Sequence, residues 1–301
     1  MTGARLSRRA MLTLGTGTAL AAVTATAGTA HASVPGGDVV GRRLAELERE
    51  YDARLGVFAH NVRTGRTVSY HADQSFPMCS LFKTLAAAAV LRDLDRDGEF
   101  LAKRVRYTQK DVEEADWAPE TSKHIADGMT VAELCDAAIT QSDNAAANLL
   151  LRELGGPTAV TRFCRSIGDR TTRLDRWEPH LNSAEPWRVE DTTSPRAIGR
   201  TYARLVLGSA LSPRDRGQLT TWLLANTTNI QRFRAGLPAD WTLGDKTGAG
   251  DYGTNNDVGI AWTPDGSPLV LAVLTTKHTQ KAEAEDALIA DTARLLAATL
   301  G

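Results

Sequence analysis

Four short fragments, in a fixed order along the chain, carry the side chains that could do chemistry. They are Ser80-Leu81-Phe82-Lys83, Ser142-Asp143-Asn144, Glu178-Pro179-His180-Leu181-Asn182 and Lys246-Thr247-Gly248. The first places a hydroxyl and an amine three residues apart, and on a helix this spacing puts both side chains on one face. A serine beside a lysine is a nucleophile beside a potential base. The other fragments add a second hydroxyl, an amide, a carboxylate and a second lysine, which together can hold a substrate carboxylate and activate water.

Each fragment alone also fits a purely structural role. Ser80 could be a plain helix N-cap with Lys83 solvated in the first turn, and Ser142 or Asp143 could cap a following helix. Glu178 alone reads as a surface acid, and Lys246-Thr247-Gly248 alone reads as a turn at the end of a strand-like run. The four fragments together, rather than any one of them, indicate a catalytic site.

Predicted strands and helices at both ends of the chain must position these fragments. An amphipathic helix is predicted from the helical spacing of Val40, Leu44, Leu47, Tyr51 and Leu55. Short β-rich runs follow at 56–62 and 66–71, and others lie at 241–246, 257–263 and 268–276. A terminal helix is predicted from the stripe Ile289, Ala293, Leu296 and Leu300.

The middle of the chain reads as helical. Thr130 and Glu133 form a capping box, Gly155-Gly156 is a helix stop, and Ser194-Pro195 and Ser212-Pro213 are N-caps followed by a first-turn proline. We therefore predict an α+β fold, an α/β/α sandwich in which one antiparallel sheet is flanked by the N- and C-terminal helices and an all-helical domain is inserted. The α/β domain spans 33–72 and 225–301, and the helical domain spans 73–224. A cleft between them is the expected ligand site.

SxxK followed by SDN and KTG is the motif set of class A β-lactamases and penicillin-binding proteins. In order and spacing the chain resembles the class A serine β-lactamases across nearly all of residues 33–301. The resemblance implies that Ser80 is the acylated nucleophile, that Lys83 is its proton-transfer partner, and that Ser142 protonates the departing β-lactam nitrogen. Glu178 and Asn182 would orient the deacylating water. Whether Lys83 or Glu178 is the acylation base stays open.

The same resemblance implies the substrate-binding residues. Lys246 and Thr247 would hold the drug's carboxylate, and Gly248 lets a substrate approach the backbone. Asn144 would bind the acylamino side chain, and the backbone N–H groups of Ser80 and Ala249 would form the oxyanion hole. Trp117 fits an aromatic residue at the cleft mouth. Arg176 and Asp191 match the ion pair that closes the neck of an Ω-shaped loop, which lies in the helical domain.

Two positions depart from the family's pattern. Many members place an arginine after KTG on the next strand, where this chain has Asn255, and Arg232 matches the position that other members use instead. The chain also lacks two disulfides found in some members: Cys135 matches one half of the first, but the partner position holds Ala87, and Gly250 stands where a partner of Cys79 would be. Strong carbapenemase activity is therefore not implied.

The sequence argues against other classes of protein. A DD-peptidase or penicillin-binding protein, or a non-hydrolysing β-lactam sensor, would share the fold but lack the Glu178 element. The chain has no GxSxG motif, which a Ser-His-Asp esterase would need. Its histidines are too scattered to form the zinc site of a zinc enzyme. The predicted function is hydrolysis of the β-lactam amide of penicillins and cephalosporins, which confers resistance. It requires no metal and no organic cofactor.

The first 32 residues read as an export signal rather than as part of the fold. Arg8-Arg9 precede a mildly apolar stretch and a small-x-small cleavage pattern at Ala30-His31-Ala32. The pattern resembles a twin-arginine signal, with an ordinary secretory signal as the alternative. We expect cleavage near Ala32 and a secreted or periplasmic protein. No later stretch reaches the roughly 18 apolar residues of a membrane span, so no membrane anchor is expected.

Charge and cysteine content exclude further classes. After residue 32 the chain has 32 basic and 36 acidic residues, a net charge of −4, which favours neither nucleic acid nor an anionic membrane as partner. Small-molecule β-lactams are the expected partners of a monomer. Cys79, Cys135 and Cys164 show no metal spacing, and they are either three buried thiols or one disulfide with one free thiol.

Overall fold

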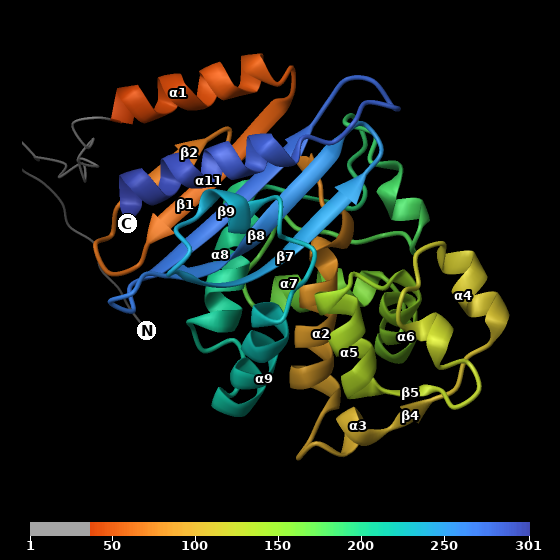
Figure 1. Ribbon diagram of the computed structural model, residues 1–301. Helices are drawn as coiled ribbons and strands as arrows, with labels where there is room; N and C mark the ends of the chain where they lie inside the picture. The colour runs from red at the N-terminus through yellow and green to blue at the C-terminus, as the bar shows by residue number, and fades with distance from the viewer. Residues whose placement is uncertain (1–36) are drawn as a thin grey trace, which may run out of the picture. The chain divides into compact units, whose positions relative to one another are not determined.

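The two ends of the described chain build one five-stranded antiparallel sheet (Figure 1). The computed structural model describes residues 37–301, so the predicted export signal at 1–32 lies outside the described residues. The sheet order is β2-β1-β9-β8-β7. Its strands are β1 (Arg54–Asn61), β2 (Thr67–Tyr70), β7 (Thr242–Gly250), β8 (Thr254–Trp262) and β9 (Pro268–Thr276). The predicted pairing of N-terminal with C-terminal strands is confirmed, because β1 pairs with β9 along its whole length.

Helices cover both faces of this sheet. α1 (Gly37–Glu50) and α11 (Asp286–Leu300) pack on one face, and α8 (Pro195–Val206) packs on the other (Figure 1). In β9, Leu269, Leu271 and Val273 belong to the core under α1 and α11, while the alternate residues face α8. A strand buried on both faces has no polar side, which explains the continuous apolar run of β9. The predicted α+β sandwich is confirmed.

The segment between β2 and β7 is mostly helical. Its helices are α2 (Phe82–Ala89), α3 (Glu99–Ala102), α4 (Gln109–Ala115), α5 (Val131–Thr140), α6 (Asn144–Leu154), α7 (Thr158–Ser166), α8, α9 (Pro213–Leu224) and α10 (Phe233–Gly236). Short strand pairs join β3 (Phe76–Pro77) to β6 (Thr192–Thr193) and β4 (Arg104–Val105) to β5 (Met129–Thr130). The domain bounds at 72/73 and 224/225 stay a prediction.

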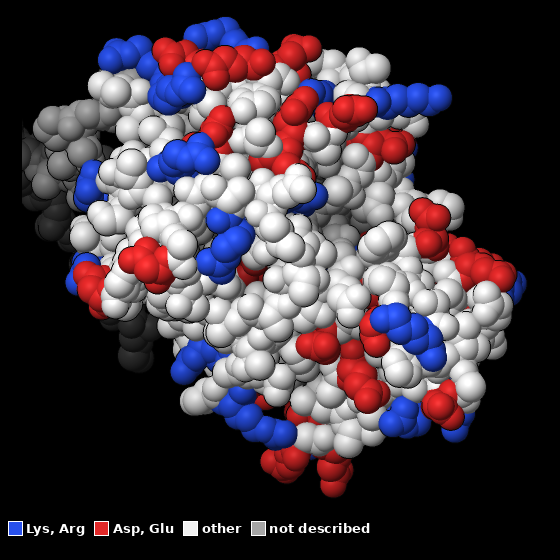
Figure 2. Space-filling model, viewed as in Figure 1, with Lys and Arg blue, Asp and Glu red and all other residues white. Residues whose placement is uncertain are grey.

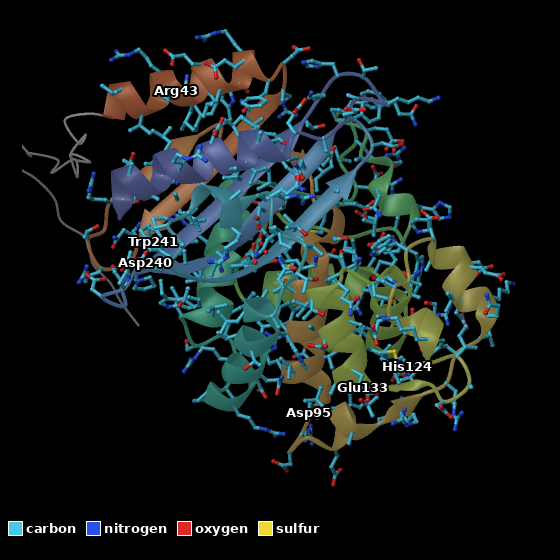
Figure 3. All side chains as sticks on the ribbon, viewed as in Figure 1. Arg43, Asp95, His124, Glu133, Asp240 and Trp241 are labelled. Atoms are coloured by element: carbon cyan, nitrogen blue, oxygen red, sulfur yellow. The ribbon has the colours of Figure 1, made fainter. Side chains whose placement is uncertain are left out.

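Local signals placed most helix ends correctly. Thr130 and Glu133 form both hydrogen bonds of the predicted capping box, and Glu133 lies at the start of α5 (Figure 3). Ser194 and Ser212 cap α8 and α9, each followed by proline. Of the two candidates for the α6 cap, Asp143 is the residue that accepts the Ala146 N–H.

Two local predictions were wrong, and one structural alternative is excluded. Leu55 is not on the first helix, because α1 ends at Glu50 and the chain turns through Asp52 (φ 45°) into β1. Ser80 is not an N-cap, since it lies inside a 3-10 turn, Cys79–Leu81. Lys246-Thr247-Gly248 does not end its strand: β7 continues to Gly250, because Thr254-Asn255-Asn256 pairs with it as the start of β8.

The surface charge is mixed. On the face shown in Figure 2, Lys and Arg side chains lie among Asp and Glu side chains, with no extended patch of one sign. Arg43, on the outer side of α1 (Figure 3), forms ion pairs with Glu46 and Glu50 along its own helix. Within residues 37–301, no helix combines the length and the apolar character needed to cross a bilayer.

Candidate active site

Ser80 lies in a strained turn that enters α2. Its neighbour Cys79 has φ 47°, in the left-handed region that residues other than glycine rarely occupy. Asn256 of β8 secures this turn, because its Nδ2 donates to Pro77 O (3.0 Å) and Met78 O (3.3 Å). The Ser80 side chain is therefore held at the junction of α2 and the sheet, and it is 6% exposed.

Lys83, fully buried one turn after Ser80, joins three of the four fragments. Its Nζ donates to Ser142 O (2.7 Å) and Asn144 Oδ1 (2.6 Å) and lies 3.1 Å from Glu178 Oε1. The Ser142 hydroxyl is 3.3 Å away. Burial lowers the pKa of Lys83, because a charged amine loses its hydration, and the Glu178 carboxylate opposes this shift. The predicted groups around the nucleophile thus meet at one amine.

Glu178 is held from two sides. Asn182, one turn later, donates from Nδ2 to Glu178 Oε2 at 2.5 Å. Asn148 of α6 makes two bonds to the Glu178 backbone: its Oδ1 accepts the N–H (3.1 Å) and its Nδ2 donates to the C=O (3.0 Å). The Glu178 side chain is fully buried. A fixed, nearly dry carboxylate beside an amine can accept a proton from water.

The loop that carries Glu178 is closed at its neck by the predicted ion pair. Arg176 Nε lies 2.5 Å from Asp191 Oδ2, and Asp191 Oδ1 accepts the backbone N–H of Asp175 (2.7 Å) and Arg176 (2.9 Å). A carboxylate that is 1% exposed and fully hydrogen-bonded fixes both ends of the loop. The loop also contacts the turn between β7 and β8, because Asn182 O accepts the Asp251 N–H (2.9 Å).

The edge strand β7 forms the opposite wall. A Cβ at Gly248 would lie 3.0 Å from Met78 O and 3.3 Å from the Ser80 N, so a larger residue would push β7 away from the nucleophile. Ala249 follows at the exposed edge. Lys246 is fully buried, and its pKa is well below the usual value because of burial and of the cations Lys83 and Arg232.

Arg232 also contacts this wall. Its Nη1 donates to Asn256 O (3.2 Å) and Gly248 O (3.4 Å), and its Nε lies 2.7 Å from Asp286 Oδ1 of α11. Asn255 also donates to Asp286 Oδ1 (2.9 Å). Asn255, which stands where many family members have an arginine, therefore helps to hold Asp286, and Asp286 in turn holds Arg232.

Trp117 and Asn144 mark the helical rim of the site. The Asn144 N–H donates to Trp117 O (2.7 Å), and Trp117 Nε1 donates to Gln141 O (3.1 Å), so the indole is tethered although its side chain is 57% exposed. Asp143 lies beneath them and accepts the N–H of Thr121 (2.9 Å). These bonds fix the loop 115–121 to the second fragment.

Sequence reasoning missed four positioning residues: Asn148, Thr228, Asn256 and Asp286. Asn148 had a usable signal, because it lies four residues after Asn144 and so on the same helix face. The Thr228 hydroxyl lies 2.5 Å from that of Thr247. The other two contact the site across strands or helices distant in sequence, and no local pattern indicates them.

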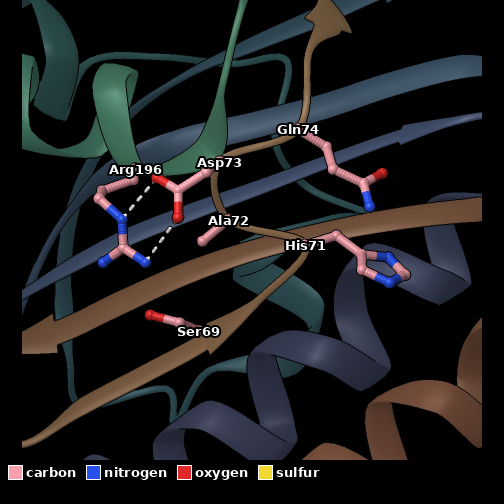
Figure 4. A pocket seen from close by; sticks show the side chains of 6 residues that line it. All are labelled: Ser69, His71, Ala72, Asp73, Gln74 and Arg196. Atoms are coloured by element: carbon pink, nitrogen blue, oxygen red, sulfur yellow. Dashed lines mark hydrogen bonds and ion pairs between the residues drawn. The ribbon is translucent and has the colours of Figure 1, made fainter.

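The cysteines and a second hollow do not belong to this site's chemistry. All three cysteines are buried free thiols, the first of the two alternatives. An open hollow elsewhere is lined by Ser69, His71, Ala72, Asp73, Gln74 and Arg196, and contains none of the predicted site residues (Figure 4). The Arg196 guanidinium in it already binds Asp73 in a bidentate pair. Among residues 37–301, no cluster of three His, Cys, Asp or Glu side chains is arranged to hold a metal.

Known proteins resemble this chain over nearly its whole length. A family model described as "Beta-lactamase enzyme family" matches residues 40–300. A β-lactamase of Streptomyces albus G is 66% identical over 99% of this chain and 98% of that protein, and one of Streptomyces fradiae is 64% identical over 98% and 97%.

Solved structures agree with these matches. A β-lactamase from Streptomyces albus G has a TM-score of 0.87 at 69% identity, with 87% of this chain and 100% of that chain covered. An ancestral class A β-lactamase has a TM-score of 0.82 at 53% identity, with 86% and 99% covered. Matches of this extent, to sequences and to folded class A enzymes alike, show that the chain belongs to the β-lactamase enzyme family as a class A serine β-lactamase.

Proposed function

We propose that this β-lactamase acts through an acyl-enzyme on Ser80, which water activated by Glu178 then hydrolyses. The Ser80 oxygen attacks the β-lactam carbonyl as its proton passes to Glu178, and the ring C–N bond breaks as Ser142 passes a proton to the nitrogen. The proton on Glu178 then returns through Lys83 to Ser142, which leaves Glu178 free to act on water. Water then attacks the ester, Glu178 accepts its proton, and Ser80 leaves with a proton. The observation that carries this proposal is the buried contact of Glu178 with Lys83, with Asn182 holding the other carboxylate oxygen.

The contacts of Lys83 indicate where protons lie before substrate arrives. Its amine donates to Ser142 O and Asn144 Oδ1, and the Glu178 carboxylate lies 3.1 Å away as an ion-pair partner that favours the ammonium form. An ammonium has no free lone pair. We therefore assign the first proton acceptance to Glu178, and Lys83 becomes a base only after giving a proton to that carboxylate.

The β7 wall supplies the substrate carboxylate site. Lys246, Thr247 and Arg232 are the cationic and hydroxyl groups that converge there, and Ser80 and Ala249 offer backbone N–H groups to the oxyanion. Asn144 and Trp117 would contact the side chain of the drug. Penicillins and cephalosporins are the proposed substrates, and hydrolysis of these drugs confers resistance.

Turnover counting tests the proposed cycle against a β-lactam-binding protein that is only acylated. We expect a chromogenic cephalosporin to be hydrolysed far beyond one equivalent per protein, at the same rate with and without EDTA, because the proposed catalytic groups are side chains. A burst that stops at one equivalent would assign the chain to the non-hydrolysing alternatives. Activity lost in EDTA and restored by zinc would overturn the serine mechanism.

We further propose that residues 1–32 export the enzyme by the twin-arginine route, and that it acts as a secreted or periplasmic monomer. Arg8-Arg9 and the Ala30-His31-Ala32 pattern support this. The protein recovered outside the cytoplasm should begin near Ser33, as intact mass shows, and replacing Arg8 and Arg9 by lysine should retain the precursor inside. Unchanged export of that variant would favour the ordinary secretory route.

A further inference from the structure

Two buried carboxyl groups that the proposed mechanism does not use lie side by side in the sheet. Asp245 of β7 and Asp257 of β8, here called the carboxyl pair, are both 0% exposed. Asp257 is paired with Thr247, so strand alternation puts it on the same face as Asp245. The strand register makes them diagonal neighbours on that face, close enough for their carboxyl groups to interact. Among the described residues, no N–H or hydroxyl group donates to Asp245 Oδ2 or Asp257 Oδ1.

A proton between these two oxygens satisfies both of them. Two adjacent buried carboxylates cannot both stay charged. Asp245 is the better anion, because its Oδ1 accepts from Asn226 Nδ2 (3.0 Å) and Asn229 Nδ2 (2.7 Å). Asp257 Oδ2 accepts from the Phe233 N–H (3.1 Å). Burial and the neighbouring acid raise the pKa of Asp257 well above its usual value, which places the proton there.

The donors to the carboxyl pair all lie in residues 226–233, here called the clamped segment. This segment carries Arg232 and Thr228 to the substrate carboxylate site. Because Asn226 turns its Nδ2 to the pair, its Oδ1 faces Thr228 and accepts that hydroxyl's hydrogen at 2.8 Å. The Thr228 oxygen is then left to accept from Thr247 at 2.5 Å. The pair thus fixes the segment at its start, middle and end.

Charged and titratable groups of the surrounding elements face the carboxyl pair. Lys246 lies on β7 itself, and both acids favour its ammonium form. Arg232, at the end of the clamped segment, opposes the raised pKa of Asp257 and is itself paired with Asp286 of α11. Tyr202 of α8 has its pKa raised by burial and by both acids. One negative charge on the pair therefore supports two cations of the carboxylate site.

We propose that Asp245 and Asp257 share one proton and together act as positioning residues, which hold the clamped segment in place and leave one negative charge beside Lys246 and Arg232. The inference rests on the proposed function, because it assigns these cations to the substrate carboxylate. It makes two predictions, one on the proton and one on substrate binding, and the first does not depend on activity.

The shared proton should appear in the pH dependence of unfolding. An aspartate in the unfolded chain has a pKa of about 3.9, so above pH 5 the unfolded chain has lost the proton that the folded chain keeps. Folding then takes up one proton, and stability from this source falls as pH rises. We therefore expect the unfolding equilibrium constant to rise more steeply with pH in the parent than in Asp257→Asn. Between about pH 5.5 and 7.5, the ratio of the parent's constant to that of the variant should grow about tenfold per pH unit.

The amide in Asp257→Asn donates the hydrogen that the shared proton supplies, so this variant should fold. Asp245→Asn should flatten the slope equally, because Asp257 then remains as a single anion. Asp240→Asn, an exposed acid just before β7, is the control and should keep the parent's slope. Parallel slopes in the parent and Asp257→Asn would show that no proton is shared and would overturn the proposal.

Measurements of KM distinguish a carboxyl pair that shares one negative charge from two acids that act independently. Each single amide variant keeps one negative charge, so KM for a penicillin should stay within about threefold of the parent value. The double variant, Asp245→Asn with Asp257→Asn, has no charge and presents an amide hydrogen to Asn226 and Asn229. Its KM should rise roughly 10- to 100-fold, the effect of losing a hydrogen bond to a charged group, with a smaller change in kcat.

The Arg232→Ala variant distinguishes a failure of the proposed substrate carboxylate site from a failure of the positioning role of the carboxyl pair. If it raises KM as the double variant does, both the carboxylate site and the role of the carboxyl pair are supported. If Arg232→Ala raises KM and the double variant does not, the positioning role is wrong while the proposed function stands. If Arg232→Ala leaves KM unchanged, the assignment of Arg232 to the substrate is wrong, and the positioning role fails with it. Should the double variant not fold, the pH slopes of the single variants decide the proposal.

Discussion

Ser80→Ala should reduce β-lactam hydrolysis by at least about 10⁴-fold, since no other described hydroxyl is placed to carry the acyl group. The Ser142 hydroxyl also lies close to Lys83, at 3.3 Å, but the proposed cycle uses it as the proton donor to the leaving nitrogen. The site's binding groups on β7 remain in the variant. It should therefore still bind a penicillin reversibly, as a ligand-induced rise in melting temperature shows.

Ser75→Ala is the matched control, because this exposed serine lies just before the nucleophile turn and should leave the rate unchanged. Mass spectrometry of the intact protein after mixing with a penicillin completes the test. The parent should show a transient adduct, and Ser80→Ala should show none. A folded Ser80→Ala variant that turns over at the parental rate, or that still forms the adduct, would move the nucleophile to another residue.

Glu178→Gln should separate the two halves of the reaction and trap the acyl-enzyme. Deacylation loses its positioned base, which costs typically about 10²- to 10⁴-fold. Acylation is less affected, because Glu178 is the main group that opposes the lowered pKa of Lys83. Without that carboxylate, burial favours the neutral amine, and neutral Lys83 can take the Ser80 proton. A penicillin should therefore accumulate on Ser80 as a stable mass shift.

Glu190→Gln, on the same loop and with its side chain 39% exposed, is the control and should turn over normally. The distinguishing measurement is the ratio of burst amplitude to steady rate. A full burst followed by slow release supports the assignment. If Glu178→Gln never becomes acylated, Glu178 is the required acylation base; if it turns over like the parent, deacylation uses another group.

Much of this protein was readable from short stretches of sequence, because the signals involved are local. Helix caps such as Thr130 with Glu133, and the buried stripe of α11, depend on hydrogen bonds and spacing within one or two turns. The motif residues were also predictable as a set, because each lies on or beside a well-signalled element. Three of the four fragments lie together at Lys83 in the folded protein.

Strand limits were less predictable. The sequence ends β7 at Lys246 and starts β8 at Asp257, yet the two strands pair from Thr242 with Trp262 to Gly250 with Thr254. Small and polar residues such as Gly248 and Asn255 have weak strand preference by themselves. They become strand because the neighbouring strand supplies their hydrogen bonds, and that supply is a property of the assembled sheet.

By itself, the sequence determined the class of the fold, the order of the catalytic fragments and the family. The tertiary structure alone decided what holds those fragments. Asn256 secures the nucleophile turn from 179 residues away, Asp286 anchors Arg232 across 54 residues, and Asp245 meets Asp257 only because of the register of β7 against β8. Such contacts depend on sheet register and on the packing of helices against it, which no local pattern of side chains encodes.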